Sequence, residues 1–153
     1  MHSTRNLGPQ QTSGSILRTV IDEVTELPPG GGLLVLVTGP VGSGKSSLVR
    51  ELTRALPGWS GIRVSALSWH AGNEGELLAH ILERADHEGT LTELADREGA
   101  RTAVIIDDVH WADVTSLREL VDATRRLRKG SLAVIMTASD HDDASDDLPM
   151  SHL

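Results

Sequence analysis

The feature that most constrains this chain is a glycine-rich segment at residues 39–46, which reads Gly-Pro-Val-Gly-Ser-Gly-Lys-Ser. It matches G-x-x-x-x-G-K-[ST], the pattern of a phosphate-binding loop. Glycines let the backbone curl closely enough for its N–H groups to surround phosphate oxygens, and a helix beginning at the loop directs its positive end at the same anion. The segment therefore predicts a nucleotide-binding turn between a strand and a helix.

The flanking sequence has the properties of that strand and that helix. An apolar run over residues 33–37, bounded by glycines, is typical of a strand buried on both faces in a parallel sheet. Residues 46–56 have the pattern of a helix, which Pro57 and Gly58 end. Because strand, loop and helix follow in the required order, we prefer this interpretation to the alternative of an ordinary glycine-rich turn.

Two side chains at the end of the loop carry specific chemistry. Lys45 offers a mobile cation to the β- and γ-phosphates of a nucleotide. Ser46 offers a hydroxyl to Mg²⁺, a hard ion that prefers oxygen ligands. We therefore predict both a binding and a catalytic role for Lys45 and a metal-binding role for Ser46.

A second apolar strand, over residues 102–106, ends in the two carboxylates Asp107 and Asp108. In phosphate-loop enzymes a strand beside the first carries an Asp at its C-terminal end that reaches Mg²⁺. Asp107 has this position, and Asp108 follows it as a candidate general base that polarises an attacking water. The alternative is that the pair opens a turn and caps the next helix, because Asp is common at turns.

The remaining sequence alternates between helical and strand patterns. A helical stripe covers residues 16–27, a weaker strand 62–67, a helix 74–87 and a last strand 132–136, with Asp113 as the N-cap of the helix before it. Such alternation predicts an α/β fold: a phosphate-loop core with a parallel sheet and helices on both faces.

We expect three segments along the chain. Residues 1–13 are polar and predict a loose, flexible N-terminal arm. Residues 14–139 form the predicted core. Residues 140–153 begin with an acidic run and predict a disordered tail.

Composition excludes several classes of protein. The 153 residues contain no cysteine, which excludes a disulfide scaffold, a thiolate zinc site and a cysteine nucleophile. The net charge of −8 argues against direct DNA binding, which relies on neutralising phosphates. No apolar run approaches the length of about 18 residues that a membrane-spanning helix needs. We therefore expect a cytoplasmic protein that does not bind membranes.

Residues 107–113 read Asp-Asp-Val-His-Trp-Ala-Asp and are followed by Ser116 and Leu117. This segment resembles the D-D-x-H-W-A-D-x-x-S-L signature of AAA-like ATPase domains of the STAND type, which lie at the N-terminus of large ATP-binding LuxR-type transcriptional regulators. Residues 34–48 are similar to the first strand and phosphate-binding loop of that group. The resemblance covers about residues 15–139.

The resemblance implies ATP and Mg²⁺ as ligands and ATP as a switch between an assembly-competent state and a reset state. It implies a metal contact by Asp107, a catalytic role for Asp108 and the order 2-3-4-1 for the four predicted strands. The residues that it implies in nucleotide binding are Gly39, Pro40, Val41, Gly42, Ser43, Gly44, Lys45, Ser46 and Ser47. It assigns no role to His110 or Trp111; the simplest interpretation is that Trp111 packs the turn.

Two departures from the group affect the expected activity. Many members carry an Arg in a T-x-R-like sequence at the end of the fourth strand, where this chain has Thr137-Ala138-Ser139, so Ser139 replaces a cation that senses the γ-phosphate. The group also continues into a fifth strand and a helical lid, and we expect this chain to be truncated after the fourth strand. The strand over residues 33–37 would then lie near a sheet edge, which favours self-association through the core.

The sequence therefore predicts ATP binding with slow or absent hydrolysis, in the nucleotide-switch module of a signalling ATPase that regulates transcription. Two alternatives stay open. One is a small phosphate-loop kinase acting on a metabolite, although such an enzyme needs an Arg-rich lid and the sequence from Ser131 onward contains no Arg. The other is a truncated, non-catalytic fragment that binds nucleotide.

Overall fold

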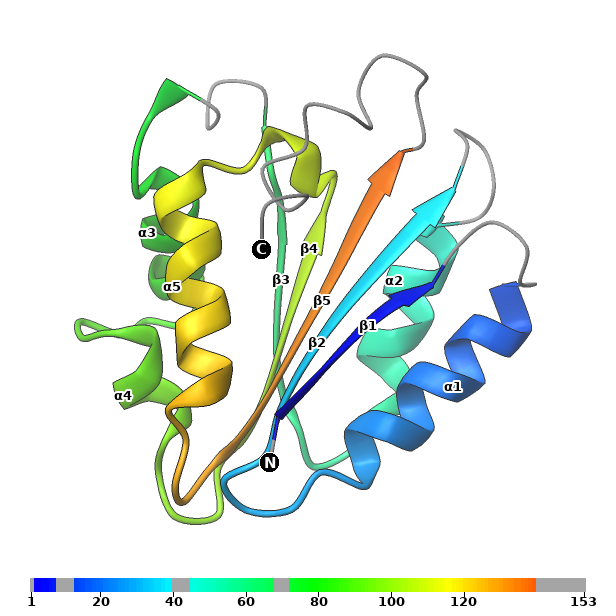
Figure 1. Cartoon of the computed structure of the whole chain (residues 1–153), viewed down its shortest axis with the longest axis horizontal. Helices are drawn as coiled ribbons and strands as arrows, with labels where there is room; N and C mark the ends of the chain where they lie inside the picture. Colours follow the sequence, from blue (N-terminus) through cyan, green and yellow to red (C-terminus); the bar gives the residue numbers. More distant parts are fainter. Residues whose placement is uncertain (1, 8–12, 40–44, 68–71, 140–153) are drawn as a thin grey trace.

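The structure, a computed structural model, describes residues 2–7, 13–39, 45–67 and 72–139 (Figure 1). Five strands form one sheet in the order β1-β2-β5-β4-β3, and every neighbouring pair is parallel. The strands are β1 (His2–Leu7), β2 (Gly32–Gly39), β3 (Ser60–Ser65), β4 (Arg101–Asp107) and β5 (Ser131–Ser139). The predicted α/β class with a parallel sheet is confirmed.

Helices cover both faces of the sheet (Figure 1). Helices α1 (Ser13–Thr25) and α2 (Lys45–Ala55) lie on one face, and their apolar side chains share a core with those of the sheet. On the other face lie α3 (Glu76–Arg84), α4 (Leu91–Ala95) and α5 (Val114–Arg125), which enclose a second core. A short 3-10 helix, η2 (Val109–Trp111), connects β4 to α5.

Strand β2 lies between these two cores. Leu33, Val35 and Val37 pack into the core beneath α1 and α2, whereas Leu34 packs into the core beneath α5. This alternation follows from the two-residue period of a strand. Because both faces are covered, an uninterrupted apolar run is the expected sequence for β2, and the prediction of a strand buried on both sides is confirmed.

The order 2-3-4-1 for the four predicted strands is confirmed, since these are β3, β4, β5 and β2. The sheet nevertheless has a fifth strand that we did not predict. Strand β1 pairs with β2 from His2↔Gly32 to Leu7↔Val37, so the prediction of a loose arm is wrong for residues 2–7. Residues 8–12 and the predicted tail at 140–153 lie outside the described residues.

Strand β1 changes the expected edge of the sheet. It lies where the four-strand prediction left β2 unpaired, so the prediction that residues 33–37 lie at an edge is wrong. Residues 2–7 carry mostly polar side chains and no apolar run, and their strand conformation depends on pairing with β2. A polar strand suits an edge better than the apolar β2 does, because an exposed hydrophobic edge strand favours pairing with other chains and aggregation.

Asp96 binds the loop between α5 and β5, at the edge of the sheet where the strands begin. Its Oδ1 accepts hydrogen bonds from the amides of Arg128, Lys129 and Gly130, at 2.9, 2.7 and 3.1 Å. These amides, that of Lys129 first, lower the pKa of the Asp96 carboxyl below its ordinary value. The turn that leads from α5 into β5 is thereby tied to the end of α4.

Candidate functional site

The strand and the helix predicted on either side of the phosphate-binding loop are present. Strand β2 ends at Gly39 and α2 begins at Lys45, on the α1–α2 face of the sheet. Residues 40–44 lie outside the described part of the chain, which includes the predicted nucleotide-binding residues from Pro40 to Gly44. For Gly39, Lys45, Ser46 and Ser47 the structure describes the backbone conformation.

Asp107 is the last residue of β4 and is half-buried. All strands of the sheet run in the same direction, so β2 and β4 end at the same edge (Figure 1). The two strands are not adjacent, however, because β5 lies between them. The expectation of an Asp on a strand directly beside the first is therefore wrong, whereas the order 2-3-4-1 that the resemblance implied already separated these two strands.

The intervening strand places Thr137 between the two predicted halves of the site. Thr137 pairs with Val37 of β2, two residues before Gly39. On its other side, the pair Ile106↔Met136 puts Asp107 next to Thr137. Val37, Thr137 and Asp107 therefore form a row across the C-terminal edge of the sheet.

This row lies on the face covered by α2. Val37, Ile135 and Ile105 pack into the same core as α2 residues such as Leu52. Thr137 and Asp107 follow Ile135 and Ile105 by two positions, and residues two apart in a strand share a face. The Asp107 carboxylate is therefore on the side of the sheet where α2 begins at Lys45.

The side chain of Thr137 is fully buried and joins the two carboxylate residues. Its hydroxyl donates a hydrogen bond to Oδ1 of Asp107. Its oxygen accepts the amide hydrogen of Asp108, with a nitrogen to oxygen distance of 3.3 Å. Sequence reasoning missed this function of Thr137, because the partners are 30 and 29 positions away and no local pattern connects them.

Asp108 leaves the strand in a left-handed conformation, with φ 56° and ψ 47°. Asp adopts this region more readily than most residues with a side chain. It opens η2, as the alternative interpretation of the Asp-Asp pair expected, but its half-buried carboxylate makes no capping hydrogen bond to η2. The turn therefore begins at Asp108, directly after Asp107 at the C-terminal end of β4.

The cap of the next helix is Asp113, as predicted, and it also binds a second helix. The carboxylate is buried, with 1% of the residue exposed, and accepts the amide of Ser116 in α5 at 2.9 Å. It also accepts the amides of Gly75 and Leu77 at the start of α3, at 2.6 and 3.4 Å. Ser116 adds a third link, because its Oγ accepts the amide of Leu78 at 2.9 Å.

Glu74, which precedes α3, makes the reciprocal contact to the first turn of α5. Its Oε2 accepts the amide of Thr115 at 3.2 Å and the hydroxyl of the same residue. The residues before α3 and before α5 thus each bind the first turn of the other helix. Sequence reasoning did not identify Glu74, whose partner is 41 positions away.

Burial acts to raise the pKa of Asp113, but hydrogen bonds from the amides of Gly75, Ser116 and Leu77 and from the Ser116 hydroxyl outweigh burial. The net effect is a pKa below the ordinary value of an Asp carboxyl. Asp113 is therefore a buried, ionised anchor next to η2.

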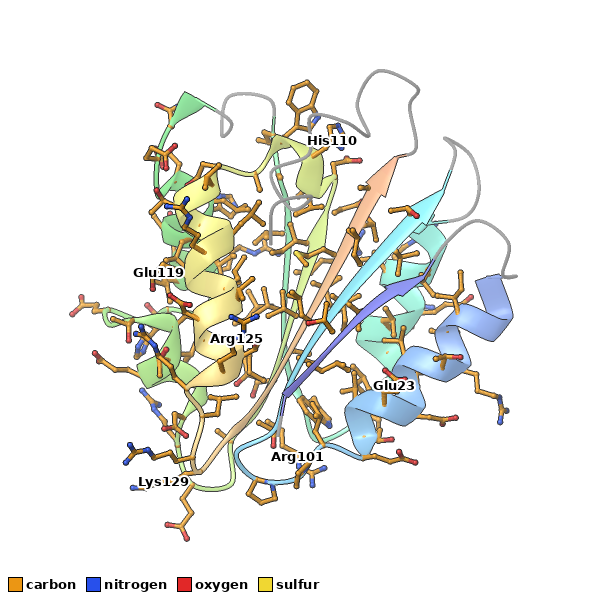
Figure 2. The ribbon with its side chains drawn as sticks, in the orientation of Figure 1. Glu23, Arg101, His110, Glu119, Arg125 and Lys129 are labelled. Carbon is orange, nitrogen blue, oxygen red and sulfur yellow. The ribbon has the colours of Figure 1, made fainter. Side chains whose placement is uncertain are left out.

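Trp111 is the exposed residue of η2, and His110 beside it is half-buried. Their ring centroids lie 4.9 Å apart with a 46° angle between the planes, and 41% of Trp111 remains exposed. His110 lies at the edge where the strands end, whereas Arg101 and Lys129 lie at the opposite edge (Figure 2). The cation of Lys129 is therefore distant from the predicted nucleotide site.

Ser139, which stands where the resemblance places an Arg, is the last residue of β5. Its backbone pairs with Gly39, the first residue of the predicted phosphate-binding loop. The position is therefore next to the start of that predicted loop. The side chain of Ser139 is outside the described part of the structure.

Comparisons with known proteins find one matching family and a similar solved structure. The sequence model of a family described as "AAA domain" matches residues 30–141. The structure of PCH-2 from C. elegans is similar over 89% of this chain and 41% of that chain, with 20% sequence identity and a TM-score of 0.47. No curated protein matches the sequence. None of the helices in the described ranges is long and apolar enough to cross a membrane.

Proposed function

The chain belongs to the AAA-domain family, and on this premise we propose that it binds ATP together with Mg²⁺ through the edge formed by the ends of β2, β5 and β4. The observation that carries the proposal is the row of Val37, Thr137 and Asp107 on the α2 face. It brings a half-buried carboxylate to the side of the sheet on which the loop helix begins.

The residues at this edge have the chemistry that a magnesium nucleotide requires. The Asp107 carboxylate supplies hard oxygen donors, the class of ligand that Mg²⁺ prefers. Ser46 is the second proposed metal contact, at the start of α2. Bound Mg²⁺ would neutralise charge on the phosphates. Lys45 would bind the β- and γ-phosphates, and the sequence pattern of residues 39–47 assigns them to phosphate binding.

We propose that Asp108 orients the attacking water and accepts its proton. Asp108 directly follows the proposed metal ligand at the end of β4, and its carboxylate makes no capping hydrogen bond to η2. We expect hydrolysis to be slow, because Ser139 occupies the position next to Gly39 where an Arg would stabilise developing negative charge. Slow hydrolysis suits a nucleotide switch, because the signal then depends on which nucleotide is bound and not on its turnover. We propose that this switch belongs to an ATPase that regulates transcription.

Titration calorimetry with ATP, in the presence and absence of Mg²⁺, tests the proposal. Lys45→Ala removes a charge-assisted contact of about 1.5–3 kcal/mol, so affinity should fall by roughly 10-fold to 150-fold. Lys129→Ala is the matched control, because it removes the only other lysine, at the opposite edge of the sheet (Figure 2). Equal affinities for the wild type and the Lys45→Ala variant would contradict the assignment.

A further inference from the structure

We propose that Thr137 is a positioning residue that sets the orientation of the Asp107 carboxylate toward Mg²⁺ and holds the turn at Asp108. The inference rests on the proposed binding of a magnesium nucleotide and adds a residue to that site. It starts from the two hydrogen bonds of the Thr137 hydroxyl, one to a carboxylate and one from an amide.

The two hydrogen bonds fix the orientation of the Thr137 hydroxyl. A threonine hydroxyl has one hydrogen to donate, and here it goes to Oδ1 of Asp107. A lone pair of the same oxygen accepts the Asp108 amide at 3.3 Å. Because the donor and an acceptor site both have partners, the side chain connects the end of β4 to the first residue of the turn in one geometry.

The bond to Oδ1 limits rotation of the Asp107 carboxylate. The terminal torsion of an Asp side chain is broad and roughly two-fold, so an unrestrained carboxylate turns easily. With Oδ1 held by Thr137, Oδ2 is the oxygen that we assign to the metal or to a metal-bound water. Partners of this kind that orient a metal ligand typically change metal affinity by about 10–100-fold when removed.

Packing alone does not require a hydroxyl at this position. Thr137 is fully buried in β5, beside Val37 of β2 and two positions after Ile135. A valine has nearly the same shape and suits a buried strand equally well. A buried hydroxyl costs free energy unless it is hydrogen-bonded, and here both bonds go to the two carboxylate residues.

Three substitutions separate positioning from packing. Thr137→Val removes the hydroxyl and keeps the shape, whereas Thr137→Ser keeps the hydroxyl and removes a methyl group. Thr102→Val is the matched control, because Thr102 is also a buried strand threonine but lies near the start of β4, at the opposite edge. Thermal unfolding of each variant reports whether it folds, and Thr137→Ala replaces Thr137→Val if that variant does not.

The measurement is the dissociation constant of ATP as a function of free Mg²⁺, with an EDTA sample as the metal-free limit. Added Mg²⁺ should tighten ATP binding, and we expect Thr137→Val to raise the Mg²⁺ concentration that gives half of this effect by roughly 10-fold or more. The affinity for ATP without Mg²⁺ should be unchanged. Thr137→Ser and Thr102→Val should stay within about 2-fold of the wild type, below the typical loss for removing such a partner.

The outcomes distinguish this inference from the proposed function. If the wild type binds ATP in a Mg²⁺-dependent manner and Thr137→Val has the same Mg²⁺ dependence, the positioning function is overturned and the proposed function stands. An equal loss in Thr137→Ser and Thr137→Val also overturns it, because packing would then explain both. If the wild type shows no Mg²⁺-dependent binding, both proposals fail together.

Discussion

The carboxylate of Asp113 lies 2.6 Å from the amide nitrogen of Gly75, 38 positions earlier in the chain. The same carboxylate caps α5 through the amide of Ser116. The D-x-x-S part of the segment that resembles the STAND-type signature therefore has a structural explanation: Asp113 and Ser116 both bind amides at the start of α3. This part of the segment joins two helices, α3 and α5.

Replacing Asp113 should lower the free energy of unfolding substantially. Asp113→Ala leaves the amides of Gly75, Leu77 and Ser116 without their partner, and each unsatisfied buried group costs about 1–3 kcal/mol. Urea unfolding followed by circular dichroism measures the loss. Asp122→Ala is the control on the same helix, because the Asp122 side chain is 46% exposed and its ion pair with Arg126 spans 3.8 Å. A loss no larger than that of Asp122→Ala would contradict the assigned anchoring.

The anchoring by Asp113 should depend on pH in a defined direction. Its pKa in the folded protein is lowered, because the hydrogen bonds to its charged form outweigh burial. The stabilisation is therefore fully present above the unfolded pKa of about 4 and disappears as the pH falls through the lower folded pKa. The test compares the free energy of unfolding of the wild type with that of Asp113→Asn between pH 7 and about pH 2.5. The difference between the two proteins should become smaller as the pH falls. A difference that grows as the pH falls below about 4 would have the wrong sign.

Substitution of Asp108 should separate hydrolysis from binding. Asp108→Asn removes the proposed base and keeps a side chain that tolerates the left-handed conformation at φ 56°. We expect ATP affinity within about 2-fold of the wild type and hydrolysis lower by roughly 10²–10⁴-fold, the usual contribution of a general base. Single-turnover assays with excess protein suit the slow rate that we expect. Unchanged hydrolysis would remove Asp108 from the mechanism and leave Asp107 unaffected.

Removal of β1 should promote self-association. Deleting residues 1–7 exposes the backbone edge of β2, from Gly32 to Val37, with its apolar side chains. We expect concentration-dependent scattering from the deletion variant that the full chain does not show. Thr4→Ala is the control, because Thr4 is exposed and its substitution keeps the strand. Equal scattering from the deletion variant and the full chain would show that β1 does not protect this edge.

Much of the architecture could be read from local patterns. The apolar runs of β2, β4 and β5 are continuous, because parallel strands between two helical layers are buried on both faces. The glycine-rich segment had to lie between a strand and a helix, and Asp107 had to lie at a strand end, since each position follows from its immediate neighbours. Asp113 was likewise predicted as a cap from the helix that follows it.

Only the tertiary structure decided which distant segments meet. Strand β1 is polar, so no local pattern marked it, and its conformation depends on pairing with β2 about 30 residues later. Thr137 became part of the site because β5 lies between β2 and β4. Glu74 and Gly75 contact Thr115 and Asp113 because α3 packs against α5. Apolar periodicity encodes burial locally, whereas a hydrogen bond between distant segments depends on the sheet order and helix packing that bring its donor and acceptor together.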